Sequence, residues 1–231
     1  MGCRTPVRSP LIRAAMRGIR RERGSAQRQA KPLLRDDLFV VLAATGDGLK
    51  DIRDRVLLLV GFAGGFRRAE LTALDRTDLE RVRQGMIITI RRSKTDQEGA
   101  GRQIGIPLGR TKCCPCAALD HWLAAAGIED GAVFRRVDRH GRVSAEVLSA
   151  EAVCLVVRER VAAVGFDPAG YSGHSLRAGF ATSAVQAGVP TLKVRAQTGH
   201  ASDAMLARYV RDGELFVDNA AGLCSDLRWF R

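Results

Sequence analysis

The chain has 231 residues, of which 46% are hydrophobic and 5% aromatic, and its 37 lysines and arginines exceed its 25 acidic residues. The resulting net charge of +12 predicts a polyanionic partner, although a basic soluble protein or an RNA-binding protein has a similar balance. Few aromatic residues disfavour a stacking surface for single strands, so duplex DNA gripped through its phosphates fits the composition better.

Apolar residues at helical spacing predict a helical first quarter of the chain. The expected elements are a short helix within residues 1–17, a polar linker over 20–31, a helix beginning near 38 and a strongly buried helix over 52–62. Gly64 and Gly65 are expected to end the last of these helices.

Short strands and then more helices follow in the expected order. The β-branched run around Ile87 and Ile88 is typical of a strand. The remaining expected elements are strands over 79–82, 86–90 and 103–107, a helix over 115–125, a hairpin over 133–143, a long helix over 145–164, and helices starting near 175, 191 and 202. The sequence therefore predicts a mainly α fold with a small antiparallel β-sheet, of the α+β class.

Three of the six cysteines cluster as Cys113-Cys114-Pro115-Cys116. A structural zinc site needs a second pair of ligands at a defined spacing, which the sequence does not supply, so we expect reduced thiols at the start of a helix and no metal. The sequence has no apolar run of about 18 residues, so no membrane span is expected, and the cysteine usage is typical of a cytoplasmic protein.

The C-terminal third carries the residues that indicate chemistry. His174 and Arg177 form a His-x-x-Arg motif, Gly199-His200 follows, and Tyr209 is one of only two tyrosines in the chain. Arginine binds phosphate oxygens, histidine moves protons near neutral pH, and tyrosine can form a covalent intermediate. Singly, such residues are more often packing residues; together they point to phosphoryl transfer.

This order of residues resembles the tyrosine recombinases, or phage-type integrases, in which a similar short interval separates the second histidine from the tyrosine. Two upstream segments strengthen the resemblance. The segment from Gly65 to Leu71 is similar to the first arginine motif of the family and maps its catalytic arginine to Arg67. The segment from Arg91 to Gly99 is similar to the hairpin that presents the catalytic lysine, which maps to Lys94.

The resemblance implies a division of labour among these six residues. Tyr209 attacks a DNA phosphate and leaves a 3′-phosphotyrosine, while His174 takes its proton and Lys94 protonates the leaving 5′ oxygen. Arg67, Arg177 and His200 bind the non-bridging oxygens, so neither a metal nor another cofactor is expected.

The resemblance also implies an organisation. Residues 1–31 are expected to be the remnant of a core-binding-domain helix plus linker, and residues 32–231 the catalytic domain. The apolar residues after Tyr209 predict a tail that either folds back on its own domain or joins a neighbouring protomer, giving a monomer in solution and a tetramer on DNA. The expected location is cytoplasmic, with the nucleoid.

Two alternatives remain at this point. Residues 188–199 also fit a helix-turn-helix, which would make the chain a regulator or a truncated, non-recombining DNA-binding protein. A type IB topoisomerase shares the chemistry. Arg67 and Lys94 argue against the first alternative, and the spacing and small size argue against the second.

Overall fold

The computed structural model describes residues 9–23, 30–91, 101–200, 202, 204–207 and 209. Lys94, the centre of the expected linker and the tail after Tyr209 lie outside the described residues. The first described helix, α1 (Pro10–Arg23), is longer than the sequence predicted and includes the beginning of the expected linker. Its apolar residues Leu11, Ile12, Met16 and Ile19 are exposed.

The centre of the fold is α3 (Leu49–Ala63), which contacts helices on several sides. These helices are α4 (Arg68–Thr72), α5 (Pro115–Ala125), α6 (Ala150–Ala162) and α7 (His174–Gln186). Two further helices, α2 (Arg35–Ala43) and α8 (Thr191–Thr198), pack against α7. The five consecutive residues from Val56 to Val60 are all buried. A helical segment that is apolar on every side must be enclosed by neighbours, which explains why this part of the expected helix lies in the core.

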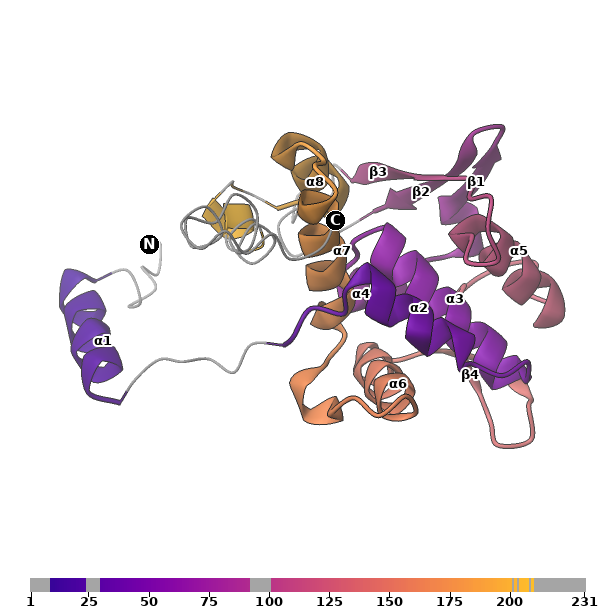
Figure 1. The fold of residues 1–231 in the computed structure, drawn as a ribbon, viewed down its shortest axis with the longest axis horizontal. Helices are drawn as coiled ribbons and strands as arrows, with labels where there is room; N and C mark the ends of the chain where they lie inside the picture. Colours follow the sequence, from indigo (N-terminus) through magenta and orange to yellow (C-terminus); the bar gives the residue numbers. More distant parts are fainter. Residues whose placement is uncertain are drawn as a thin grey trace, which may run out of the picture.

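A three-stranded antiparallel sheet in the order β1-β2-β3 lies at the same end of the fold as α8 (Figure 1). Its strands are β1 (Leu79–Val82), β2 (Gly85–Ile90) and β3 (Arg102–Pro107), each within one residue of its predicted bounds. Ile88 pairs with Ile104 and Met86 with Ile106, and all four side chains are buried. The alternation of buried residues along β2 and β3 therefore sets one face of the sheet against the core.

A second hairpin of β4 (Arg135–Val137) and β5 (Val143–Val147) corrects one prediction. The expected helix over 145–164 begins only at Ala150, because Ser149 caps it by accepting a hydrogen bond from the Ala152 amide at 3.1 Å. The preceding residues continue the hairpin instead, and the Leu148 amide donates to the Phe134 carbonyl at 2.8 Å. The hairpin itself was predicted, but it extends farther than expected.

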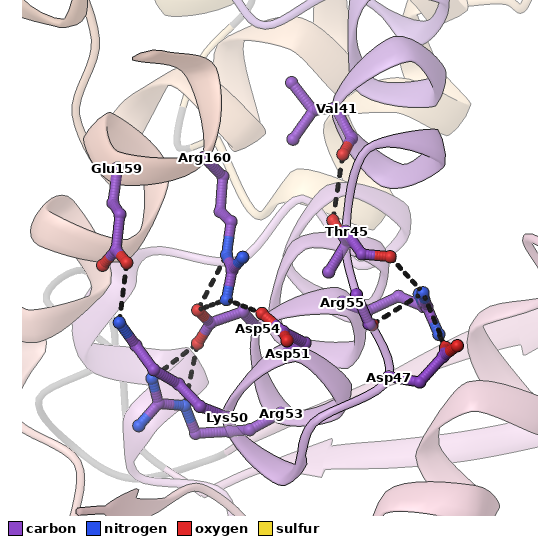
Figure 2. A network of polar contacts seen from close by, with 11 residues as sticks. Val41, Thr45, Asp47, Lys50, Asp51, Arg53, Asp54, Arg55, Glu159 and Arg160 are labelled. Atoms are coloured by element: carbon purple, nitrogen blue, oxygen red, sulfur yellow. Dashed lines mark hydrogen bonds and ion pairs between the residues drawn. The ribbon is translucent and has the colours of Figure 1, made fainter. Parts of the chain in front are cut away.

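Buried charges fasten α6 to α3 (Figure 2). The Asp54 side chain is fully buried and accepts hydrogen bonds from Arg53 of its own helix and Arg160 of α6, at 2.5–2.9 Å. Arg160 also reaches Asp51 at 2.6 Å. A carboxylate removed from water needs such partners. The ion pairs of Asp54 with Arg160 therefore hold α6 in place against α3.

Among the described residues, no helix has the length and apolar character needed to cross a membrane.

Candidate active site

Arg67 stands at the N-cap of α4, two residues after Gly65. Glu70, one turn into the helix, is buried and accepts from the Arg67 amide at 3.0 Å and from its Nη1 at 2.5 Å. The Nη2 of Arg67 donates to the Gly199 carbonyl at 3.3 Å. The guanidinium is thus held between a carboxylate from its own helix and the residue that precedes His200.

Arg177 lies on α7 and is only 2% exposed. Its Nη1 donates to the Gly65 carbonyl at 2.7 Å and also to the Thr198 carbonyl. Burial, together with the nearby positive charge of Arg67, lowers the pKa of Arg177 to about 10, so the group stays charged at neutral pH. Within the described part of the chain, its Nη2 is buried without a hydrogen-bond partner, and a buried cationic donor of this kind is a strong site for an anion.

His200 is placed by the end of α8. Gly199 ends that helix in the left-handed conformation, with φ +64°, and turns the chain so that His200 is buried. The imidazole Nδ1 lies 2.7 Å from the Thr198 hydroxyl. Burial and then the charges of Arg177 and Arg67 lower the pKa of His200 to about 3, so the imidazole is neutral at physiological pH.

Tyr209 meets both histidines. Its hydroxyl lies 2.7 Å from Nε2 of His174, the first residue of α7. The ring centroids of Tyr209 and His200 are 5.6 Å apart. A phenol at this distance from an imidazole can pass its proton to a ring nitrogen that carries none, which is the arrangement that nucleophilic catalysis needs.

The structure therefore brings together five of the six residues selected from the sequence: Arg67, His174, Arg177, His200 and Tyr209. The sixth, Lys94, is outside the described residues, although β2 and β3, the strands on either side of its segment, are paired as predicted. The helix α8, which also fitted a helix-turn-helix, contributes Thr198 to the arginine and histidine contacts.

Comparison with known proteins decides the family. The model of the phage integrase family matches residues 33–214, which is most of the chain. The chain belongs to the phage integrase family. Its fold agrees with that of solved recombinase structures. The structure of the XerH site-specific recombinase bound to a palindromic difH substrate, a post-cleavage complex, matches with a TM-score of 0.66 at 19% identity. The match covers 84% of this chain and 53% of the XerH chain. A λ integrase dimer on a COC′ core site matches with a TM-score of 0.60, also at 19% identity, covering 87% and 58%.

Two curated relatives from bacteria and phage match at the level of sequence. An integrase/recombinase xerD homologue of Selenomonas ruminantium is 40% identical over 221 residues, covering 95% of this chain and 65% of the relative. Recombinase cre of Escherichia phage P1 is 28% identical over 230 residues, covering 91% and 66%. The chain thus spans just under two thirds of the length of each of these relatives.

Three residues of this integrase-family site were not selected from the sequence. Glu70 was part of the quoted arginine motif, so its position was visible although its role was not. Arg102 of β3 donates to Glu70 at 3.1 Å and to the Gln197 carbonyl at 2.7 Å, and burial lowers its pKa. Thr198 is the third. Arg102 could not be found from spacing, because its partners Glu70 and Gln197 are distant in the chain. Thr198 directly precedes the Gly199-His200 motif, so its position was visible although its contact with His200 was not.

Proposed function

We propose that this chain carries the catalytic part of a site-specific tyrosine recombinase, which cleaves and rejoins duplex DNA through a 3′-phosphotyrosine without a metal ion. The observation that carries the proposal is the 2.7 Å contact of the Tyr209 hydroxyl with His174, beside two arginines and a neutral histidine. Family membership and the net charge of +12 support DNA as the substrate. Residues 32–231 would form the catalytic domain, and residues 1–31 the end of a core-binding domain with its linker.

The first chemical step balances with the residues at hand. The Tyr209 oxygen forms a bond to phosphorus while its proton passes to His174, and the bond from phosphorus to the 5′ oxygen breaks. Lys94, by resemblance to the family, supplies the proton that the leaving 5′ hydroxyl needs. Attack of another 5′ hydroxyl on the phosphotyrosine reverses the step, so the ester bond energy is retained and no ATP is consumed.

The transition state carries extra negative charge on the non-bridging oxygens, and this charge is where the other groups act. Arg67 and Arg177 are preorganised by carbonyl and carboxylate contacts before DNA binds, so little reorganisation is needed during the reaction. His200 adds a neutral hydrogen-bond donor. These groups provide the charge stabilisation that a metal ion provides in many nucleases, which is why cleavage is expected to proceed in excess EDTA.

The two tyrosines of the chain allow a matched test. Tyr171 is buried and stacks on Phe166 with ring centroids 6.2 Å apart. The assay is capture of a denaturation-resistant protein–DNA adduct from a labelled pool of nicked duplexes of random sequence. Tyr171→Phe is expected to form the adduct, and Tyr209→Phe is expected to form none while still binding duplex DNA.

An adduct formed at normal level by Tyr209→Phe would refute the nucleophile. Loss of all adduct in EDTA, with recovery on adding magnesium, would refute the metal-independent mechanism and favour a nuclease.

We also propose that the chain is a monomer in solution and a tetramer on DNA, located with the nucleoid in the cytoplasm. The sequence after Tyr209 contains Leu215, Phe216, Leu227, Trp229 and Phe230, which is too apolar for a solvated tail. If a neighbouring protomer receives this tail, deleting the residues after Asp212 reduces strand exchange more than single-strand cleavage. If the tail instead belongs to its own core, the deletion unfolds the domain.

A further inference from the structure

Thr198, the last residue of α8, contacts three separate parts of the site. Its side chain and backbone are fully buried. Its carbonyl accepts from Arg177, and its hydroxyl lies 2.7 Å from Nδ1 of His200. Its methyl group occupies the space beside Gly65, where an added Cβ would lie only 2.9 Å from it. Thr198 therefore connects Arg177 and His200 to the turn at Gly65.

The hydroxyl has one proton and three acceptors within reach. The Val194 carbonyl lies at 2.7 Å, the Arg195 carbonyl at 3.4 Å and His200 Nδ1 at 2.7 Å. The destination of this proton matters, because a neutral imidazole has one donor nitrogen and one acceptor nitrogen, and the partner of one nitrogen decides the state of the other.

The two destinations have opposite consequences for a bound phosphate. If the hydroxyl donates to Val194, Nδ1 must carry the imidazole proton and Nε2 has only a lone pair, which repels a phosphoryl oxygen. If the hydroxyl donates to Nδ1, Nε2 carries the proton and can donate to that oxygen. The Val194 carbonyl is four residues before Thr198 in α8 and is therefore also in place to accept the Thr198 amide, so it depends less on the hydroxyl than Nδ1 does.

We propose that the Thr198 hydroxyl donates to Nδ1 of His200 and so keeps the imidazole proton on Nε2, which makes Thr198 a positioning residue of the cleavage site. The tautomer assignment is argued from contacts within the chain alone, whereas its effect on cleavage rests on the proposed recombinase function. The rival explanation is that Thr198 only packs its methyl group against Gly65.

Two substitutions separate these explanations. Thr198→Val keeps the branched shape and the methyl contact but loses the hydroxyl. Thr198→Ser keeps the hydroxyl and loses the methyl. Tautomer control predicts that valine is the damaging change and that serine rescues; packing alone predicts the reverse order.

The first measurement is nitrogen-15 NMR of the four histidine side chains in the full chain, with His200→Gln used to assign the His200 signals. The wild type and Thr198→Ser are expected to show a proton on Nε2 of His200, and Thr198→Val a mixture of both tautomers. The wild-type spectrum decides the tautomer even if the valine variant does not fold. A wild-type proton on Nδ1 overturns the proposal.

The second measurement is the rate of adduct formation on the nicked duplex pool. Loss of one oriented donor to the transition state is expected to slow Thr198→Val by about 100-fold, with most of the rate retained by Thr198→Ser. Equal rates for wild type and a folded Thr198→Val overturn the positioning role. Absence of adduct from every protein, together with the expected tautomers, refutes the recombinase function and supports the tautomer assignment.

Discussion

The pH dependence of stability offers a direct test of the buried state of His200. The native pKa of His200 is about 3, against an ordinary value of 6.5, because burial and the charges of Arg177 and Arg67 disfavour the imidazolium. Between pH 3 and pH 6.5, about the two pKa values, the imidazole of residue 200 is protonated in the unfolded chain but neutral in the native chain. Unfolding therefore becomes easier as the pH falls below about 6.5, and this contribution to stability is fully present above that pH.

The size of the effect follows from the shift. One pKa unit corresponds to about 1.36 kcal/mol, so lowering the pH from 7.5 to 4.5 is expected to remove about 3 kcal/mol of unfolding free energy through this one histidine. Urea unfolding at pH 7.5 and pH 4.5 measures the loss. His200→Gln is the control, because glutamine retains hydrogen-bonding capacity but does not titrate, and the carboxylates shared by both proteins cancel in the comparison.

Wild type is expected to lose about 3 kcal/mol more than His200→Gln between the two pH values. Equal losses would refute the reasoning, as would an NMR titration in which His200 of the native chain gains its proton near pH 6.

Two further substitutions test other buried charges. Asp54→Asn is expected to lower the unfolding free energy in urea by about 3 kcal/mol, because Arg53 and Arg160 lose the carboxylate that compensates them, and a change below about 0.5 kcal/mol would contradict the network's structural role. Arg102→Met keeps a long side chain but removes its charge, so Glu70 and the Gln197 carbonyl both lose a hydrogen-bond donor near the site. This variant is expected to slow adduct formation by about 10-fold or more. An unchanged rate would show that Arg102 is dispensable.

The sequence was sufficient for the fold class, and its short motifs were sufficient to select five residues that the fold brings together. His174 and Arg177 share one helix face, and Arg67 follows a glycine turn, so local spacing revealed them. The contacts that orient them were hidden, because Arg177 reaches Gly65 across 112 positions and Arg67 reaches Gly199 across 132. Only the packing of α7 and α8 against the turn before α4 creates these pairs.

The wrong helix start at Ala145 has a similar cause. Residues 143–147 have no strong local preference, and they are extended because β4 supplies a partner for their backbone. Strand pairing is a nonlocal interaction that the local pattern does not reveal. The predicted helix therefore began at Ala145, five residues before the observed start at Ala150. The Ser149 cap was a usable local signal that the sequence interpretation overlooked.

The arrangement of charge explains how a buried site can hold several arginines and still favour a phosphate. Glu70 is shared by Arg67 and Arg102, while Arg177 is bound by backbone carbonyls and has no carboxylate partner among the described residues. These four side chains therefore carry two uncompensated positive charges. Carbonyl dipoles from Gly65 and Gly199, both in the left-handed conformation, hold the guanidiniums in place without neutralising them. In the proposed complex, the negative charge of the phosphodiester therefore reduces the repulsion among the arginines of the site when DNA binds. The additional negative charge of the transition state reduces this repulsion further.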